Sequence, residues 1–192
     1  MSIGKVPGRP DVPAVDLHSA HTANMLLSHL SDAGARRIAL VTARQRRFSS
    51  LETEAAYHDF AALHAMQPIV LTLDEARDEA LACTEGEALL RRHPEIDAML
   101  VQVDAFAVGL MEAARRIGRR VPHDLQLATR YDSIRAKLSS PPLTTVDLHL
   151  AQVATLAVEL LLDSQNGAPP ELAHPLPSLL PRRSTCRSNT DE

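Results

Sequence analysis

Short runs of apolar residues alternate along this chain with longer segments in which apolar residues recur every three or four positions. The clearest case begins with the apolar run 98–103, which ends at Asp104. A helical pattern follows, and a second apolar run, 125–128, leads to Tyr131 and Asp132. Runs of this length predict buried strands, and the longer periodicity predicts an amphipathic helix. We therefore predict a strand–helix–strand unit in which each strand leads to an aspartate.

The same alternation continues over nearly the whole chain and predicts an α/β fold with a mostly parallel sheet. Strands are expected at about 15–17, 38–41, 69–73, 98–103, 125–128 and 143–146, and helices at about 22–33, 51–66, 75–92, 106–117 and 149–164. Gly86 weakens the third helical pattern, because glycine disfavours helix interiors. Residues 1–14 are rich in proline and glycine, so we expect an extended lead-in there and a disordered tail over 186–192.

The composition narrows the class of protein without identifying it. The chain has 192 residues, enough for one good core or for a lobe and a half, and aromatic residues make up only 3%, so the core must be aliphatic. A formal net charge of −4 does not favour nucleic-acid binding by the chain as a whole. Cys83 and Cys186 are far apart, and no segment has the apolar character of a signal peptide or a membrane span. These features predict a reducing compartment, the cytoplasm, and no disulfide.

Motifs for enzyme chemistry are missing from the sequence. There is no GxSxG, no P-loop and no GxGxxG pattern. His18 and His21 have the spacing HxxH, but no third metal ligand lies nearby in the sequence. We therefore expect neither an enzyme nor a protein with a resident cofactor or metal.

Four short motifs follow one another between about residues 15 and 185. They are His29-Leu30, Gly34 and Arg36-Arg37-Ile38-Ala39; Asp104, Ala107, Gly109, Gly118, Val121-Pro122 and Asp124-Leu125; Tyr131-Asp132 and Pro141-Pro142-Leu143-Thr144-Thr145-Val146; and Leu180 and Arg182-Arg183-Ser184-Thr185. Each motif alone is weakly specific. In this order and at this spacing, they resemble the effector-binding domain of the lactose-repressor/galactose-repressor (LacI/GalR) family of bacterial transcription regulators.

The resemblance implies a Rossmann-like fold of the periplasmic-binding-protein type. In that family a small effector, usually a sugar or a nucleobase, binds between two lobes and shifts the DNA affinity of a dimer. Measured against the family, this chain starts late, so we expect no DNA-binding headpiece and no direct DNA binding by this chain.

The same comparison divides the chain into lobes. We assign 37–142 and 169–185 to a complete C-terminal effector-binding lobe, and 15–36 and 143–168 to a partial N-terminal lobe. Helices of a partial lobe would lack cover on their apolar faces. We therefore expect five leucines to be exposed and to promote self-association, namely Leu26, Leu27, Leu30, Leu156 and Leu160.

The aspartates at the two strand ends are the first candidate ligand-binding residues, because the resemblance implies effector contacts there. No helix is expected directly after Asp132, which favours a binding role for it and for the adjacent Tyr131. Asp104 opens a helix, so an N-cap role is an alternative, and one carboxylate can serve both purposes. Two neighbours depart from the family: Val103 stands where asparagine is usual, and Arg130 where glycine is usual.

The clamp arginine of the family falls on Thr53 here, which cannot make a bidentate charged contact. Arg46 and Arg47 lie in the preceding loop and could replace that charge, although solvated loop arginines would have the same sequence. Together with Arg130 they favour an anionic or phosphorylated effector. His18 falls near a turn that touches the ligand in the family, where an Asp-Asn pair is more usual.

The sequence thus favours the effector-sensing part of a LacI/GalR-type regulator, as a homodimer that binds a sugar, a nucleoside or a sugar phosphate. Two alternatives remain open. One is a solute-binding protein of the same architecture, and the other is a dimerisation remnant that has lost its ligand.

Overall fold

A four-stranded parallel sheet forms the centre of the molecule. The computed structural model describes residues 2–4, 8, 12, 14–75, 78–165 and 175–186. The strands run in the order β4 (Val70–Leu73), β3 (Ile38–Ala43), β5 (Ala98–Val101) and β6 (Gln126–Thr129). Every residue of β3, β5 and β6 is buried, as expected for parallel strands that are covered on both faces. The predicted α/β fold is confirmed.

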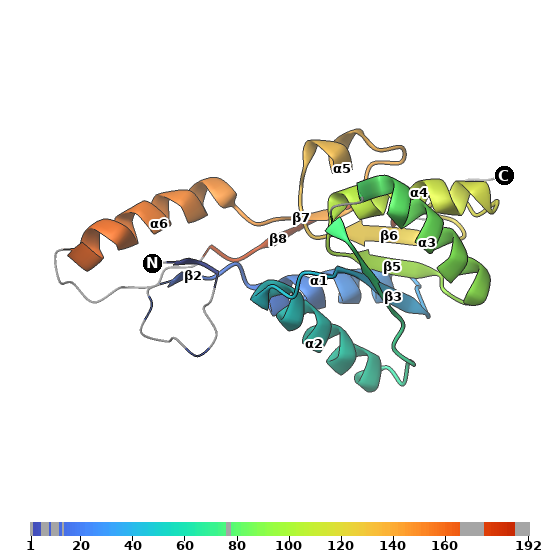
Figure 1. The fold of residues 1–192 in the computed structure, drawn as a ribbon, viewed down its shortest axis with the longest axis horizontal. Coiled ribbons are helices and arrows are strands. Elements are labelled where there is room, and N and C mark those ends of the chain that lie inside the picture. Colours follow the sequence, from blue (N-terminus) through green and yellow to red (C-terminus); the bar gives the residue numbers. More distant parts are fainter. Residues whose placement is uncertain are drawn as a thin grey trace.

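Two helices cover each face of this sheet (Figure 1). Because side chains alternate along a strand, Ile38 and Leu40 point towards α1 (Ser19–Asp32) and α2 (Phe48–Leu63). Their neighbours Ala39 and Val41 point towards α3 (Asp78–Arg92) and α4 (Asp104–Arg116). The result is a three-layer α/β/α body with an aliphatic core on each side of the sheet.

Close packing between α3 and α4 depends on two glycines. A side chain on Gly109 would overlap the carbonyl oxygen of Glu79 and the side chain of Ala82, and a Cβ atom on Gly86 would lie 2.5 Å from Leu110. The helix α3 is continuous through Gly86. The interruption suggested by Gly86 is therefore not present, because the residue serves the contact between helices.

The remaining elements form an arm that extends away from the sheet (Figure 1). Two strands lead to it, β7 (Thr145–Asp147) and the antiparallel β8 (Ser178–Leu180). The arm contains α6 (Leu150–Gln165) and a parallel pair of two-residue strands, β1 (Ser2–Ile3) and β2 (Ala14–Val15). A small cluster around Val15, Val153, Ala157 and Leu160 joins β2 to α6. A short helix, α5 (Ile134–Leu138), lies beside α4.

The position of α1 corrects one expectation. Leu26, Leu27 and Leu30 are fully buried between α1, α2 and the sheet, so α1 has its cover within the three-layer body. The expected exposure of these residues was wrong, because periodicity reveals an apolar face but not what packs on it. Leu160 is also buried and Leu156 is partly buried. Among the described residues of α6, the large apolar side chains that are exposed are Leu150, Val158, Leu161 and Leu162.

The remaining expectations concern the cysteines, membrane-spanning segments, the C-terminal tail and the division into lobes. Both cysteines are free thiols, Cys83 buried and Cys186 exposed. In the part of the chain that the structure describes, no helix is long and apolar enough to cross a membrane. The expected tail beyond Cys186, and residues 169–174 of the assigned C-terminal lobe, lie outside the described residues. The division into two lobes stays a prediction, and α1 packs with the sheet body.

Candidate effector-binding site

A hollow of about 560 Å³ lies beyond the carboxyl ends of β5 and β6. In a parallel α/β sheet this is the edge at which ligands bind. Three predicted site residues line it together: Asp104, Tyr131 and Asp132. The other lining residues are Ser133, Lys137, Val146, Asp147, Leu148 and Leu150.

Asp132 is held by three side chains of the protein itself. Arg182 donates to its Oδ1 atom at 2.6 Å, and the hydroxyl of Thr145 donates to the same atom at 3.0 Å. Lys137 Nζ lies 3.0 Å from Oδ2. Arg182 also donates to the carbonyl of Leu143 and to the hydroxyl of Thr145. Asp132 therefore connects the end of β6 to β7 and to the segment after β8.

These contacts determine the ionisation of Asp132. Burial alone would raise the pKa of this carboxyl group, but hydrogen bonds from Arg182, Lys137 and Thr145 outweigh it and hold the pKa below its ordinary value. Asp132 is thus a carboxylate at neutral pH, with both oxygens engaged. Its remaining capacity for a ligand is limited to the lone pairs that these donors leave.

Asp104 differs from Asp132 in having no such partners. It is the first residue of α4, and the N-cap position belongs to Val103, whose side chain makes no capping hydrogen bond. The N-cap interpretation of Asp104 was wrong by one residue, although a carboxylate in the first turn still complements the helix dipole. Among the described residues, no hydrogen bond or ion pair engages the Asp104 carboxylate. It faces the hollow as an available acceptor.

The loop arginines do not join Asp104 and Asp132. Arg47 forms an ion pair with Glu75 at 2.9 Å, and Arg46 lies 3.5 Å from Glu54. Both side chains are more than half exposed. Thr53 is buried in α2, where its hydroxyl donates to the carbonyl of Ser49 at 2.9 Å. None of these three residues lines the 560 Å³ hollow, and Arg47 lines a separate, smaller hollow of about 180 Å³ beside the starts of α1 and α2.

Arg130 is buried rather than turned outward to solvent, with only 4% of its surface exposed. Its Nη2 atom donates to the hydroxyl of Ser19 at 2.9 Å, at the start of α1. The guanidinium carbon lies 5.3 Å from the ring centroid of Tyr131, within the range of a cation–π contact. Arg130 therefore links the loop after β6 to the N-terminus of α1.

His18 belongs to a turn that the chain uses twice. Asp16-Leu17-His18 precedes α1, and Asp147-Leu148-His149 precedes α6. In both turns the histidine has a left-handed backbone with φ of 49°. In both, the first aspartate accepts a hydrogen bond from the histidine backbone N–H, at 3.0 Å and 2.8 Å respectively. His18 thus shapes a connection between arm and body, and the predicted ligand contact of its side chain remains a prediction.

Sequence reasoning missed Lys137, Thr145 and Arg182 as parts of this site. Thr145 and Arg182 belong to motifs that carried the resemblance, but nothing in their local sequence indicates a contact with Asp132. Arg182 is separated from Asp132 by 50 residues. The sequence did contain Asp132 and Arg182, two residues of opposite charge in two of the motifs. Only the fold shows that they are in contact.

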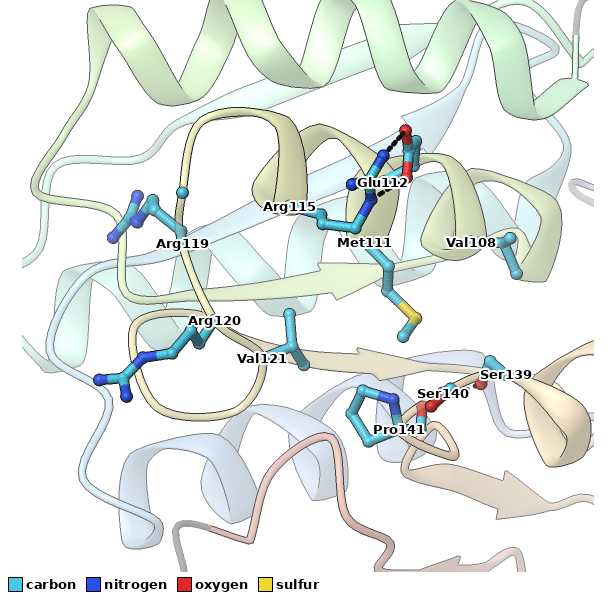
Figure 2. Close-up of a pocket in the computed structure, with 11 residues that line it drawn as sticks. Val108, Met111, Glu112, Arg115, Arg119, Arg120, Val121, Ser139, Ser140 and Pro141 are labelled. Atoms are coloured by element: carbon cyan, nitrogen blue, oxygen red, sulfur yellow. Dashed lines mark hydrogen bonds and ion pairs between the residues drawn. The ribbon is translucent and has the colours of Figure 1, made fainter. Parts of the chain in front are cut away.

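A second hollow of about 550 Å³ lies along α4 (Figure 2), and none of the predicted ligand-binding residues lines it. Val108, Met111, Val121 and Pro141 provide its apolar lining. Glu112 bears ion pairs with Arg115 at 2.7 Å and Arg116 at 3.0 Å. These pairs lower the pKa of Glu112 to about 2. This hollow has an apolar floor with a charged rim.

The fold, with a hollow lined by Asp104 and Asp132 at the carboxyl edge of its sheet, is that of a protein of the periplasmic-binding-protein type. The sequence profile of the periplasmic binding protein-like domain family matches residues 27–185. The chain belongs to this family. The resemblance to the effector domains of LacI/GalR-type regulators is confirmed by its relatives, which are transcriptional regulators and not enzymes.

Two curated relatives illustrate the similarity. The ribose operon repressor of Halalkalibacterium halodurans is 28% identical over 153 residues, which is 79% of this chain and 45% of the repressor. The HTH-type transcriptional regulator CelR of Thermobifida fusca is 27% identical over 169 residues, 85% of this chain and 49% of that protein. The chain therefore spans about half the length of the curated relatives it matches.

Solved structures agree on the fold. A complex of the transcriptional regulator CelR with cellobiose has a TM-score of 0.81 at 24% identity, covering 94% of this chain and 57% of that one. A sugar-binding LacI-family regulator from Escherichia coli, complexed with phosphate, has a TM-score of 0.78 at 23% identity, covering 89% of this chain and 62% of that one.

Proposed function

We propose that this chain is the effector-sensing part of a LacI/GalR-type transcription regulator and binds a sugar-like ligand in the hollow beyond β5 and β6. The observation that carries the proposal is the Asp104 carboxylate, which has no partner among the described residues and faces the hollow. Carboxylates are effective acceptors for the hydroxyl groups of a carbohydrate. One relative is named as a ribose operon repressor, and the regulator CelR has been solved in complex with cellobiose, which supports this ligand class.

Calorimetric titration with free pentoses, hexoses and disaccharides tests the proposal. A sugar that binds the native protein also raises the melting temperature by mass action. We expect Asp104→Ala to weaken binding about tenfold or more, because a charged acceptor is removed from a partly buried site. Asp124→Ala is the matched control, since Asp124 is a surface carboxylate paired with Arg120. If the chain is instead a dimerisation remnant that has lost its ligand, no sugar should bind. Equal sugar binding by Asp104→Ala and Asp124→Ala would reject the role of Asp104.

We further propose that the chain pairs with a second copy through the face of α4 shown in Figure 2. The apolar residues around Met111 support this, since a two-fold contact buries the same apolar patch of both copies. Glu112 and Arg115 place a negative and a positive charge at its rim. In a two-fold pair, the acidic residue of one copy can therefore face the basic residue of the other. The neighbouring helix α5 exposes Ile134 by 67% and Leu138 by 77%.

Light scattering coupled to size-exclusion chromatography tests this pairing. We expect Met111→Glu to convert a dimer into a monomer, because it buries a charge at the centre of the contact. Leu63→Glu is the control, since Leu63 is 82% exposed at the end of α2, away from this face. A monomeric parent protein, or a Met111→Glu variant that remains dimeric, would exclude α4 as the contact.

A further inference from the structure

Arg130 lies between a wall of the 560 Å³ hollow and the start of α1. Its neighbour Tyr131 lines the hollow and is 36% exposed, whereas Arg130 is buried and does not line it. The guanidinium of Arg130 makes two contacts. Its Nη2 atom donates to the hydroxyl of Ser19 at 2.9 Å, and its carbon lies 5.3 Å from the centre of the Tyr131 ring. One side chain therefore touches both the wall of the hollow and the first residue of α1.

The same two contacts hold the charge of Arg130 inside the protein. Its Nε atom has no hydrogen-bond partner among the described residues, and no carboxylate in that part of the chain is paired with it. A buried guanidinium without a carboxylate depends on neutral acceptors and aromatic faces for its stabilisation. Because Ser19 and Tyr131 share this role, a change at one of them should be felt at the other.

Ser19 marks the point at which the chain passes from the arm to the body. We call the preceding turn, Asp16-Leu17-His18, the first joint. Leu17 packs against the cluster that joins β2 to α6 in the arm, and Ala20 packs against the core between α1, α2 and the sheet. Ser19 lies between them and is buried. The bond from Arg130 therefore acts directly at the boundary between arm and body.

The matching turn Asp147-Leu148-His149, which we call the second joint, has a different relation to the hollow. Asp147 and Leu148 line the 560 Å³ hollow themselves, and no residue of the first joint is part of its described lining. A ligand in the hollow can therefore act on the second joint by contact. To act on the first joint it needs an intermediary, and Arg130 has the contacts of one.

We infer that Arg130 is a positioning residue that couples Tyr131, at the wall of the hollow, to the first joint of the arm. A ligand that moves or fixes the Tyr131 ring changes its contact with the guanidinium, and the guanidinium in turn holds Ser19. The coupling works equally in the other direction, because the effect of one site on another is reciprocal. The inference rests on the proposed sensor function and adds to it how occupancy of the hollow reaches both joints.

Hydrogen exchange at the two joints tests this coupling in the ligand-free protein. The backbone N–H groups of His18 and His149 start from matched bonds, at 3.0 Å and 2.8 Å, to the aspartate two residues earlier. Mass spectrometry of peptides from each joint follows their exchange. We expect Arg130→Met to raise the rate at the first joint about tenfold, because a hydrogen bond from a charged donor is lost. The second joint should keep its parental rate, which also shows that the variant is folded.

Variants of Tyr131 separate coupling from a local effect on α1. Among the described hydrogen bonds and ring contacts, none joins Tyr131 to Ser19 directly, and Arg130 contacts both. Tyr131→Ala removes the ring and should also raise exchange at the first joint, whereas Tyr131→Phe keeps an aromatic face for the cation and should retain the parental rate. The double variant Tyr131→Ala/Arg130→Met should exchange no faster than Arg130→Met alone, because both changes act through one contact.

Two further variants complete the test. Ser19→Ala removes the acceptor without removing a charge and should reproduce the effect of Arg130→Met, so the coupling can be tested even if Arg130→Met does not fold. Arg116→Met is the control and should change neither joint, because Arg116 is 53% exposed and paired with Glu112. The inference would be overturned by equal effects of Arg130→Met on both joints, by no effect on either, or by a parental rate in Tyr131→Ala.

Ribose and cellobiose distinguish failure of this inference from failure of the proposed function. A sugar that binds in the hollow should slow exchange at both joints of the parent, but only at the second joint of Arg130→Met, since Asp147 and Leu148 line the hollow. Protection of the second joint alone in the parent would overturn the coupling and leave the sensor function standing. Protection of neither joint by either sugar would count against the sugar sensor, and the ligand-free rates would still decide the coupling.

Discussion

The ends of β5 and β6 offer the same residue type to the same hollow, but they use it differently. Asp132, after β6, is engaged by Arg182, Lys137 and Thr145. Asp104, after β5, has no partner among the described residues. A carboxylate with all its partners inside the protein contributes to the fold, whereas one without partners is available to a ligand. We therefore expect Asp132 to contribute mainly to stability and Asp104, at the end of the neighbouring strand, mainly to ligand binding.

Removal of the Asp132 carboxylate should have the largest effect on stability. Asp132→Ala leaves the partly buried Arg182 without its carboxylate partner, and we expect it to lower the free energy of unfolding by about 2 kcal/mol. Urea denaturation followed by circular dichroism measures this. An effect no larger than that of Asp124→Ala would show that the Asp132 contacts contribute little.

A double-mutant cycle sharpens the same point. Arg182→Met should destabilise the protein by a similar amount, and the double variant Asp132→Ala/Arg182→Met by clearly less than the sum. Such coupling, of about 1 kcal/mol, is expected for side chains in one hydrogen-bonded network. Strict additivity would mean that the 2.6 Å contact between Arg182 and Asp132 carries no interaction energy.

The pH dependence of stability should report the contacts that Asp132 makes. The pKa of Asp132 is lowered in the folded protein, so its contribution is present above the ordinary aspartate pKa and is lost as pH falls through the lower folded value. The parent should therefore lose stability more steeply than Asp132→Asn as pH decreases below about 4. Denaturation curves at several acidic pH values measure this. If the free energy of unfolding of Asp132→Asn falls with pH as steeply as that of the parent, the contacts of Asp132 do not cause the acid sensitivity.

Loss of the Asp104 carboxylate should have the smallest effect on stability. Asp104→Ala removes a first-turn acidic residue and no other described contact, so we expect a change below about 0.5 kcal/mol. The same urea experiment measures it. A loss as large as that of Asp132→Ala would remove the distinction between the two strand ends.

The sequence allowed the fold to be predicted more fully than the site. Alternation of apolar runs and amphipathic segments located the strands of the central sheet and the helices that cover it to within a few residues. A parallel strand buried on both faces must be apolar along nearly its whole length, so it is easily recognised. The same pattern could not show that α1 is covered by α2 and the sheet. Leu26 looks the same in a sequence whether its face is buried or bare.

At the site, the aspartates were found and their roles were not. Whether Asp104 is the N-cap or the first helical residue depends on one residue, which lies within the uncertainty of any helix boundary. The partners of Asp132 come from 5 to 50 residues further along the chain. Arg130 could not be placed inside or outside from its sequence, because a lone arginine is usually exposed.

The two Asp-Leu-His turns have a practical consequence for experiments on this protein. One molecule contains the same tripeptide at two joints between arm and body, with the same backbone angle at His18 and His149. The arm helix and the body helix that follow differ, whereas the joints do not. The same substitution can therefore be made at His18 and at His149. Because the two turns have the same sequence and backbone angle, a difference between the two effects on stability reports the surroundings of the turn.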